Sequence, residues 1–473
     1  MSKAKPGFRL EKDLLGEFEV PAAAYYGVQT ARAMQNFHIT GVPIRQYPAL
    51  IRGLAMIKLG AARANHEVGQ LDAAVLRGIE GACQELIEGK LHDQFQIDCV
   101  QGGAGTSTNM NANEVIANRA LELMGKAKGE YEHCHPNDHV NLSQSTNDAY
   151  PSALHVAIVL QNRDLLASLE RLVAAFRAKA KEFGDVVKMG RTQLQDAVPM
   201  TLGQEFKAWA NSLQNEVEAL TRVERVLYQV NMGGTAIGTG LNAPAGYTEA
   251  CARHLARVTG LEIRSAPDLV EATQDTQAFV LYSSVLKSLA IKLSKVCNDL
   301  RLLSSGPRAG LNEINLPPKQ PGSSIMPGKV NPVIPEVVNM VCFRAMGNDL
   351  VVSLAAEAGQ LQLNVMEPVI AWAILESQTM FMNAARTLRE HCVEGITANR
   401  DVCKRFVETS IGVVTALNPV LGYKKSTEIA AEALRTGKGV VELVREKRLL
   451  SEAQIAEHLD PIKMVSLHRA DQA

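Results

Sequence analysis

The residues PGSSIMPGKVNP, numbers 321–332, interrupt a largely helical pattern. Two glycines and three prolines exclude a regular helix or strand here and predict a loop. Glycine permits backbone angles that other residues resist, whereas proline fixes φ and stiffens the chain. The loop carries two hydroxyls, a cation and an amide, on Ser323, Ser324, Lys329 and Asn331. An ordinary solvated loop would suit these groups too, but it would gain nothing from the apolar Ile325, Met326 and Val330, so we interpret the loop as catalytic.

Around this loop, from about residue 152 to 395, apolar residues recur at spacings of three, four and seven. They form three stripes: Ile158, Leu165, Leu169, Leu172, Phe176 and Phe183; Phe206, Trp209, Leu213, Val217, Leu220 and Leu227; Phe279, Leu286, Leu289, Leu293, Val296 and Leu300. Such stripes predict long helices packed in a bundle. Irregular stretches at 188–199, 231–244 and 304–335 interrupt the pattern, and interruptions of this length are usually functional. Pro368 should kink or break the last helical segment.

The two ends of the chain differ from the centre. Residues 1–145 are mixed, with an extended segment at 18–21, helical spacing at 49–69 and 72–88, and a glycine-rich turn before a helix from about Met110. Residues after 397 indicate short helices. We therefore expect a mainly α fold of three domains, at residues 1–145, 146–396 and 397–473.

Composition excludes several classes of protein. The 473 residues are 46% hydrophobic, and 49 basic against 50 acidic side chains give a net charge of -1, which attracts neither nucleic acid nor an anionic membrane. We find no apolar run long enough to span a membrane and no signal-peptide core at the start. Eight scattered cysteines without a CxxC pair predict a reduced, cytoplasmic protein.

Further motifs carry polar groups that chemistry could use. The stretch SQSTND, numbers 143–148, clusters hydroxyls before Pro151 and a helix, where they could form an oxyanion site or simply cap the helix. The histidines and cysteine at 133–135, with His139, do not match a standard zinc spacing, so we predict no metal. The glycines at 234–240 lack the lysine and the spacing of a nucleotide-binding loop.

The segment GSSIMPGKVNP resembles the signature of the fumarase/aspartase superfamily, and SQSTND resembles its substrate loop. The resemblance extends over nearly the whole chain. It implies a fold with a central long-helix bundle that forms the core of a homotetramer, with active sites shared between subunits. It also implies a small dicarboxylate substrate and neither an organic cofactor nor a metal ion.

By this resemblance the substrate loses a proton next to one carboxylate, and an enediolate intermediate forms. Ser323 would be the base. The remaining implied contacts are Thr106, Ser145, Thr146 and Ser324 with the β-carboxylate, Lys329 and Asn331 with the α-carboxylate, and Asn147 and Thr192 with the amino group. Serine is a poor base unless positive charge and N–H groups stabilise its alkoxide.

Details resemble the aspartases more than the class II fumarases. They include YYGVQT at 25–30, Thr146 within SQSTND, and Gln193 where many relatives carry histidine. The implied reaction is the reversible anti elimination of ammonia from L-aspartate to give fumarate. Gln193 leaves the acid for the leaving group open. Two other interpretations stay open, a class II fumarase and a helical scaffold that has lost activity.

Overall fold

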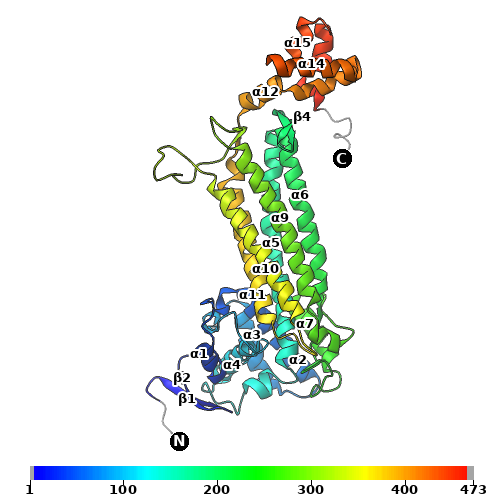
Figure 1. The fold of residues 1–473 in the computed structure, drawn as a ribbon. Coiled ribbons are helices and arrows are strands. Elements are labelled where there is room, and N and C mark those ends of the chain that lie inside the picture. The colour runs from blue at the N-terminus through cyan, green and yellow to red at the C-terminus, as the bar shows by residue number, and fades with distance from the viewer. Residues whose placement is uncertain (1–4, 466–473) are drawn as a thin grey trace. The chain divides into compact units, whose positions relative to one another are not determined.

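Helices form most of the chain in the computed structural model, which describes residues 5–465 (Figure 1). The predicted mainly α fold class is therefore confirmed. Residues 1–4 and 466–473 lie outside the described part, and so do the first residues of the predicted N-terminal domain and the last of the C-terminal one.

The predicted bundle helices are present and long. They are α5 (Thr146–Glu182), α6 (Leu202–Val223), α9 (Gln277–Leu303), α10 (Val333–Glu357) and α11 (Glu367–His391). The apolar stripes explain them, because side chains such as Phe206, Leu213 and Leu293 are fully buried.

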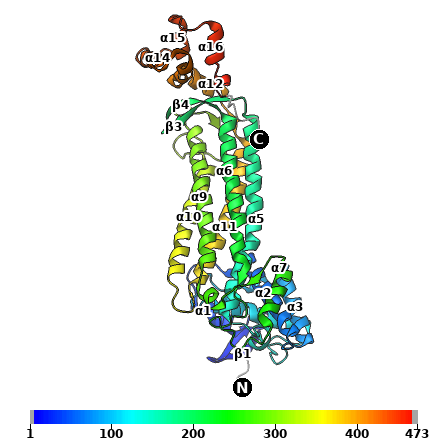
Figure 2. The same cartoon turned by 90° about the vertical axis from the view of Figure 1, so that its right-hand side faces the viewer.

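The chain divides into two compact units. Unit 1 comprises the residues up to Leu166, Glu218–Ser288 and Phe343–Phe381; unit 2 comprises Ala167–Val217, Leu289–Cys342 and the residues from Met382 onward. Within each unit, the bundle-helix segments that belong to it lie side by side (Figures 1 and 2). The predicted three-domain division at residues 145 and 396 stays a prediction.

Unit 1 surrounds α2 with other helices. Its remaining elements are β1 (Phe8–Asp13), β2 (Gly16–Pro21), α1 (Val28–Asn36), α2 (Pro48–Glu67), α3 (Ala73–Ile87), α4 (Thr106–Leu123), β5 (Gln229–Val230), α7 (Tyr247–Thr259), β6 (Arg264–Ser265) and α8 (Leu269–Gln274). β1 and β2 form an antiparallel hairpin, and β5 pairs in parallel with β6. Two glycines of α2 permit close packing: a Cβ at Gly53 would lie 2.5 Å from the Ala153 carbonyl oxygen, and one at Gly60 would lie 2.5 Å from Leu255.

Unit 2 contains a hairpin and the C-terminal helices. Its remaining elements are β3 (Val187–Thr192), β4 (Gln195–Thr201), β7 (Ile314–Asn315), β8 (Thr397–Ala398), α12 (Arg400–Thr409), α13 (Asn418–Leu421), α14 (Tyr423–Thr436), α15 (Val440–Glu446), α16 (Glu452–His458) and α17 (Pro461–Met464). The C-terminal helices share a small apolar core with Met189 of β3, which includes Val407, Leu417 and Leu443.

The prediction of irregular backbone at residues 188–199 is wrong. β3 and β4 pair antiparallel there, with a bulge between Met189 and Arg191. Two residues, Gln193 and Leu194, make the turn, and both have positive φ, at 53° and 62°. Two-residue turns of this kind usually contain asparagine or glycine. Because neither residue occurs here, the sequence contains no signal for this turn.

Two predicted helix starts also need correction. α5 begins at Thr146, before Pro151, which lies inside the helix. Proline has no N–H to donate to the Asn147 carbonyl oxygen, which accepts the side-chain amide of Asn231 instead. α4 begins at Thr106, not at about Met110. Pro368 is the second residue of α11 and thus lies at a helix start. This position agrees with the predicted break in the helical pattern.

Among the described helices, α10 is the one that is long and apolar enough to cross a membrane, with a mean hydropathy of 1.3 and 39% of that window buried. The core helix of a soluble protein can have the same length and hydropathy. Its exposed apolar side chains lie on one side of the helix: Val337, Met340, Phe343, Leu350 and Leu354.

Candidate active site

The signature loop, residues 321–332 between β7 and α10, is closed at its base by two hydrogen bonds. The Gly322 N–H donates to the Lys329 carbonyl oxygen at 2.8 Å, and the Asn331 side-chain amide donates to the Gly322 carbonyl oxygen at 2.6 Å. A Cβ at Gly322 would lie 2.6 Å from that Lys329 oxygen, so glycine is required for the closure. Ser324 and Lys329 are exposed on this loop, and their side chains are accessible to a ligand.

Ser323 is surrounded by backbone donors. Its Oγ accepts hydrogen bonds from the N–H groups of Ile325, at 3.2 Å, and Met326, at 2.8 Å. Two N–H donors stabilise negative charge on this oxygen, because they keep pointing at it when the proton leaves. The arrangement therefore supplies the N–H groups that a serine base needs.

The substrate-loop residues lie at the start of α5. Ser145 Oγ accepts the Asn147 N–H at 3.2 Å, and the Asp148 carboxylate accepts the Ser145 N–H at 2.9 Å, so Ser145 does cap the helix. Thr146 Oγ1 accepts the side-chain amide of Asn109, from α4, at 3.1 Å. Both hydroxyl oxygens accept hydrogen bonds from the protein, so each can direct its own proton to a ligand oxygen.

Thr106 is linked to the Thr146 hydroxyl through Asn109. It is the first residue of α4 and is exposed, and Asn109, which contacts Thr146, follows one turn later. Gly105 packs against the ring of Tyr150, where a Cβ would come within 2.6 Å. Unit 1 therefore brings together Thr106, Ser145, Thr146 and Asn147.

Asn147 is held from the loop that follows β5. The Asn147 side-chain amide donates to the Ala236 carbonyl oxygen at 2.8 Å. The Asn147 backbone carbonyl oxygen accepts the side-chain amide of Asn231 at 3.0 Å. The amide group thus uses a donor on the protein, which leaves Asn147 Oδ1 as an acceptor suited to an amino group.

Asp148 connects the same loop to α5. Its buried carboxylate accepts the N–H groups of Gly233, at 3.1 Å, and Thr235, at 2.9 Å, besides that of Ser145. Burial raises the pKa of Asp148 to about 7, although these backbone hydrogen bonds oppose the shift.

Thr192 lies at the tip of the β3–β4 hairpin in unit 2, next to the strained turn. Positive φ at two non-glycine residues costs about 1–3 kcal/mol each and is concentrated at functional sites. Below the tip, Glu313 is fully buried and pairs with Arg191 at 2.6 Å and with Lys188 at 2.8 Å. Burial opposes protonation of Lys188, but the carboxylates of Glu205 and Glu313 outweigh it and raise the pKa of this lysine.

We expect Glu313→Ala to lower the free energy of unfolding of unit 2 by about 3–5 kcal/mol, since it leaves Arg191 without this buried partner. Denaturant titration of the folded protein measures the change. Glu452→Ala, which breaks an exposed pair with Arg445, serves as the control and should leave the midpoint unmoved. Equal midpoints for both variants would contradict the buried network.

The predicted site residues fall into three groups. Thr106, Ser145, Thr146 and Asn147 belong to unit 1, whereas Thr192 and the signature-loop group of Ser323, Ser324, Lys329 and Asn331 belong to unit 2. Sequence reasoning missed the supporting residues Asn109 and Asn231, although Asn109 directly precedes the helix start predicted at about Met110.

The histidines considered as metal ligands make local hydrogen bonds. His135 Nδ1 accepts the N–H groups of Asn137 and Asp138, and His139 Nδ1 accepts the His135 N–H at 2.7 Å. Within residues 5–465, no three histidine, cysteine or acidic side chains gather to hold a metal.

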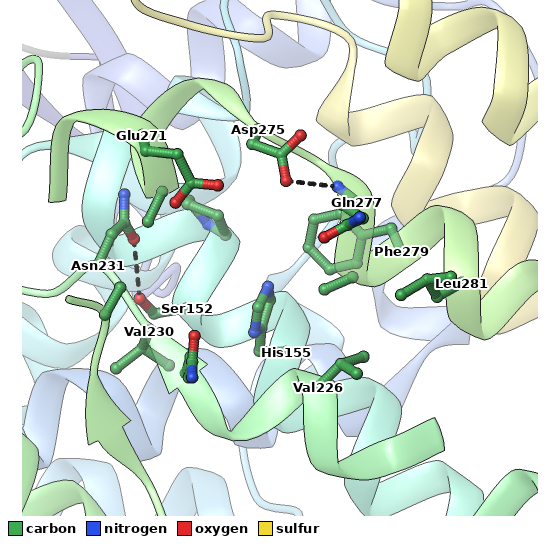
Figure 3. Close-up of a pocket in the computed structure, with 15 residues that line it drawn as sticks. Ser152, His155, Val226, Val230, Asn231, Glu271, Asp275, Gln277, Phe279 and Leu281 are labelled. Carbon is green, nitrogen blue, oxygen red and sulfur yellow. Dashed lines mark hydrogen bonds between the residues drawn. The ribbon is translucent and has the colours of Figure 1, made fainter. Parts of the chain in front are cut away.

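A cavity of about 230 Å³ in unit 1 contains none of the predicted residues (Figure 3). Ser152 and Asn231 lie on its wall, joined by a hydrogen bond of 3.3 Å, and His155 lies near them. Two carboxylates, on Glu271 and Asp275, line it as well and would repel a dicarboxylate. This cavity therefore does not fit the predicted substrate.

Comparison with known proteins supports the same chemistry. The sequence model of the family described as Lyase matches residues 16–347, and that of Fumarase C C-terminus matches residues 413–466. The chain is 60% identical to an aspartate ammonia-lyase of Pseudomonas aeruginosa over 97% of both chains. It is 55% identical to the aspartate ammonia-lyase of Escherichia coli over 94% of both.

Solved structures share the fold. A crystal structure titled fumarate lyase:delta crystallin from Brucella melitensis bound to cobalt matches with a TM-score of 0.94 and 52% identity, over 97% of this chain and 99% of that one. A class II fumarase from Schistosoma mansoni matches with a TM-score of 0.92 and 36% identity, over 98% and 100% of the two chains.

Proposed function

Because the chain belongs to the lyase family that contains the aspartate ammonia-lyases and fumarases, we propose that it deaminates L-aspartate reversibly to fumarate and ammonia. The observation that carries this function is the 60% identity, over 97% of both chains, to an aspartate ammonia-lyase. The fumarase among the structural relatives is less similar, at 36% identity.

Ser323 takes the proton from the carbon next to the β-carboxylate. The proton moves to Ser323 Oγ, and the electron pair of the C–H bond spreads into the carboxylate as an enediolate. The C–N bond then breaks, the double bond of fumarate forms, and ammonia leaves. The N–H groups of Ile325 and Met326 support this role, because they stabilise the alkoxide that accepts the proton.

The other groups bind the two carboxylates and the amine. The hydroxyls of Thr106, Ser145, Thr146 and Ser324 donate to the β-carboxylate, where charge develops. Lys329 and Asn331 hold the α-carboxylate, and Asn147 and Thr192 hold the amino group. Gln193 at the hairpin tip cannot transfer a proton, since an amide does not titrate in water.

A substrate panel tests the function. We expect a rise in the ultraviolet absorbance of fumarate with L-aspartate and none with malate or argininosuccinate. In the reverse direction, fumarate should be consumed with ammonium and should persist without it. Turnover of malate alone would make the chain a fumarase, and no turnover of any substrate would support an inactive scaffold.

We propose that the chain forms a homotetramer with active sites shared between subunits. The exposed apolar side of α10 supports this assembly: Met340 is 64%, Phe343 61% and Leu350 60% exposed in the single chain. Apolar patches of this kind mark protein interfaces. All eight cysteines are free and buried, which fits a reduced cytoplasmic protein.

We expect Phe343→Glu to dissociate the tetramer and to abolish turnover, because it places a charge in the buried interface and separates the shared sites. Light scattering after size-exclusion chromatography measures the mass. Leu434→Glu, at a residue of α14 that is 72% exposed, is the control and should remain a tetramer. A variant at Phe343 with the mass of the wild type would refute this interface.

A further inference from the structure

Lys58 of α2 is fully buried in unit 1. Its Nζ donates to Asn141 Oδ1 and Gln144 Oε1, both at 2.9 Å, and these amides are its hydrogen-bond partners among the described residues. Burial lowers the pKa of Lys58 to about 7, although the charge of Asp148 opposes the shift. A buried lysine without a bonded carboxylate is costly and calls for a function.

The two amides held by Lys58 lie in the loop that leads to the substrate hydroxyls. Between them, Ser143 has a positive φ of 61°, and its Oγ donates to Asn65 Oδ1 of α2 at 2.7 Å. Gln144 also donates from Nε2 to the Val140 carbonyl oxygen at 3.0 Å. The loop thus keeps a strained conformation because groups of α2 hold it from below.

Lys58 also determines which way the amides face. Lys58 Nζ donates to Asn141 Oδ1, so Asn141 presents its oxygen to Lys58. That same oxygen accepts the Asn109 amide at 3.1 Å, which requires Asn109 to present its nitrogen. In this orientation the Asn109 nitrogen also donates to Thr146 Oγ1 at 3.1 Å.

A reversed Asn109 amide would place its oxygen against Asn141 Oδ1 and against Thr146 Oγ1, which would then have to donate its proton to Asn109. The observed orientation has a cost, because Asn109 Oδ1 is buried and has no hydrogen-bond partner within residues 5–465. The orientation of the Asn109 amide is therefore set by the donors and acceptors around it and not by the hydrogen bonding of its own oxygen.

We propose that Lys58 is a positioning residue for the reaction: through Asn141 and Asn109 it makes the Thr146 hydroxyl a donor aimed at the ligand. This inference rests on the proposed function, in which that hydroxyl donates to the β-carboxylate. Lys58 itself does not touch the substrate. Its contribution is largest in the transition state, when the carboxylate oxygens gain charge.

A double-mutant cycle between Lys58→Met and Thr146→Val tests the proposal. Methionine has a similar length but no donor, so we expect kcat to fall about 10–100-fold and KM to change little. In the Thr146→Val background, Lys58→Met should lower kcat no further than about twofold, because its effect passes through the lost hydroxyl. A merely structural lysine would lower kcat by the same factor in both backgrounds.

Lys179→Met is the matched control. Lys179 is also buried, and it bonds Glu182 and the Ile396 carbonyl oxygen in unit 2. We expect this variant to lose stability but to keep kcat. If Lys58→Met does not fold, Asn109→Asp replaces it, because aspartate has the shape of asparagine but no N–H to donate to Thr146. We expect the same non-additive fall in kcat when Asn109→Asp is combined with Thr146→Val.

The proposal is overturned if the folded variant at Lys58, or the one at Asn109, keeps kcat within twofold of the wild type. It is also overturned if the separate effects of the two mutations on kcat multiply in the double variant. The wild type is first assayed on the substrate panel, so a failure of the proposed function is seen before any variant is compared. The cycle is then run on whichever dicarboxylate reacts.

Discussion

Replacement of Ser323 by alanine is expected to lower kcat about 10²–10⁴-fold, the contribution of a general base, while the fold and the tetramer persist. The side chain is partly exposed, and its hydrogen bonds to the N–H groups of Ile325 and Met326 are local to the loop. Its loss therefore removes the proton acceptor and little packing. Steady-state kinetics and the mass in solution measure the two effects.

The exchange of the substrate's β-hydrogen with deuterated water gives a second readout. Exchange requires removal of that proton, so the alanine variant should lose exchange together with turnover. Ser305→Ala is a control from the same connection between α9 and α10, where the hydroxyl bonds the Leu302 carbonyl oxygen, and its kinetics should match the wild type. If Ser323→Ala kept its kcat, another group would be the base.

Replacement of Lys329 by alanine is expected to raise KM about 10–100-fold, because a hydrogen bond to a charged group contributes about 1.5–3 kcal/mol. Lys329 is exposed on the loop, so the change should leave stability alone. Inhibition constants of unreactive dicarboxylates should rise by a similar factor, since the α-carboxylate is common to all of them.

Lys319→Ala, which removes an exposed lysine ten residues earlier in the same connection, controls for the general loss of positive charge. Its KM should stay near the wild-type value. An unchanged KM for Lys329→Ala would refute the anchor, and an equal rise in both variants would indicate long-range attraction instead of a direct contact.

The long helices could be predicted from the sequence because their buried faces repeat at a helical spacing. The Phe206 to Leu220 stripe, for example, lies in α6 with its apolar side chains buried. The β3–β4 hairpin could not be predicted, since Gln193 and Leu194 adopt a turn that neither residue favours. The start of α5 at Thr146 could not be predicted because its capping residue, Ser145, also belongs to a polar motif. The start of α4 follows Gly105 and has no side-chain cap that could mark it.

The predicted site residues came from a resemblance, because the physical pattern alone favoured capping over catalysis at Ser145. The contacts that support them join distant parts of the chain. Lys58 meets Asn141 across 83 residues, and Asn109 meets Thr146 across 37. A single sequence contains no signal for such pairs, because each polar side chain would also be stable in water.

The buried cysteines have a practical consequence. Burial raises the pKa of Cys99 and Cys251 to about 12, and every other thiol is shielded as well. Because only the thiolate reacts, alkylating reagents should modify the native protein very slowly. Their rate of incorporation would then report how often each segment opens to solvent, and the order in which the thiols react would map the weakest parts of the molecule without any introduced label.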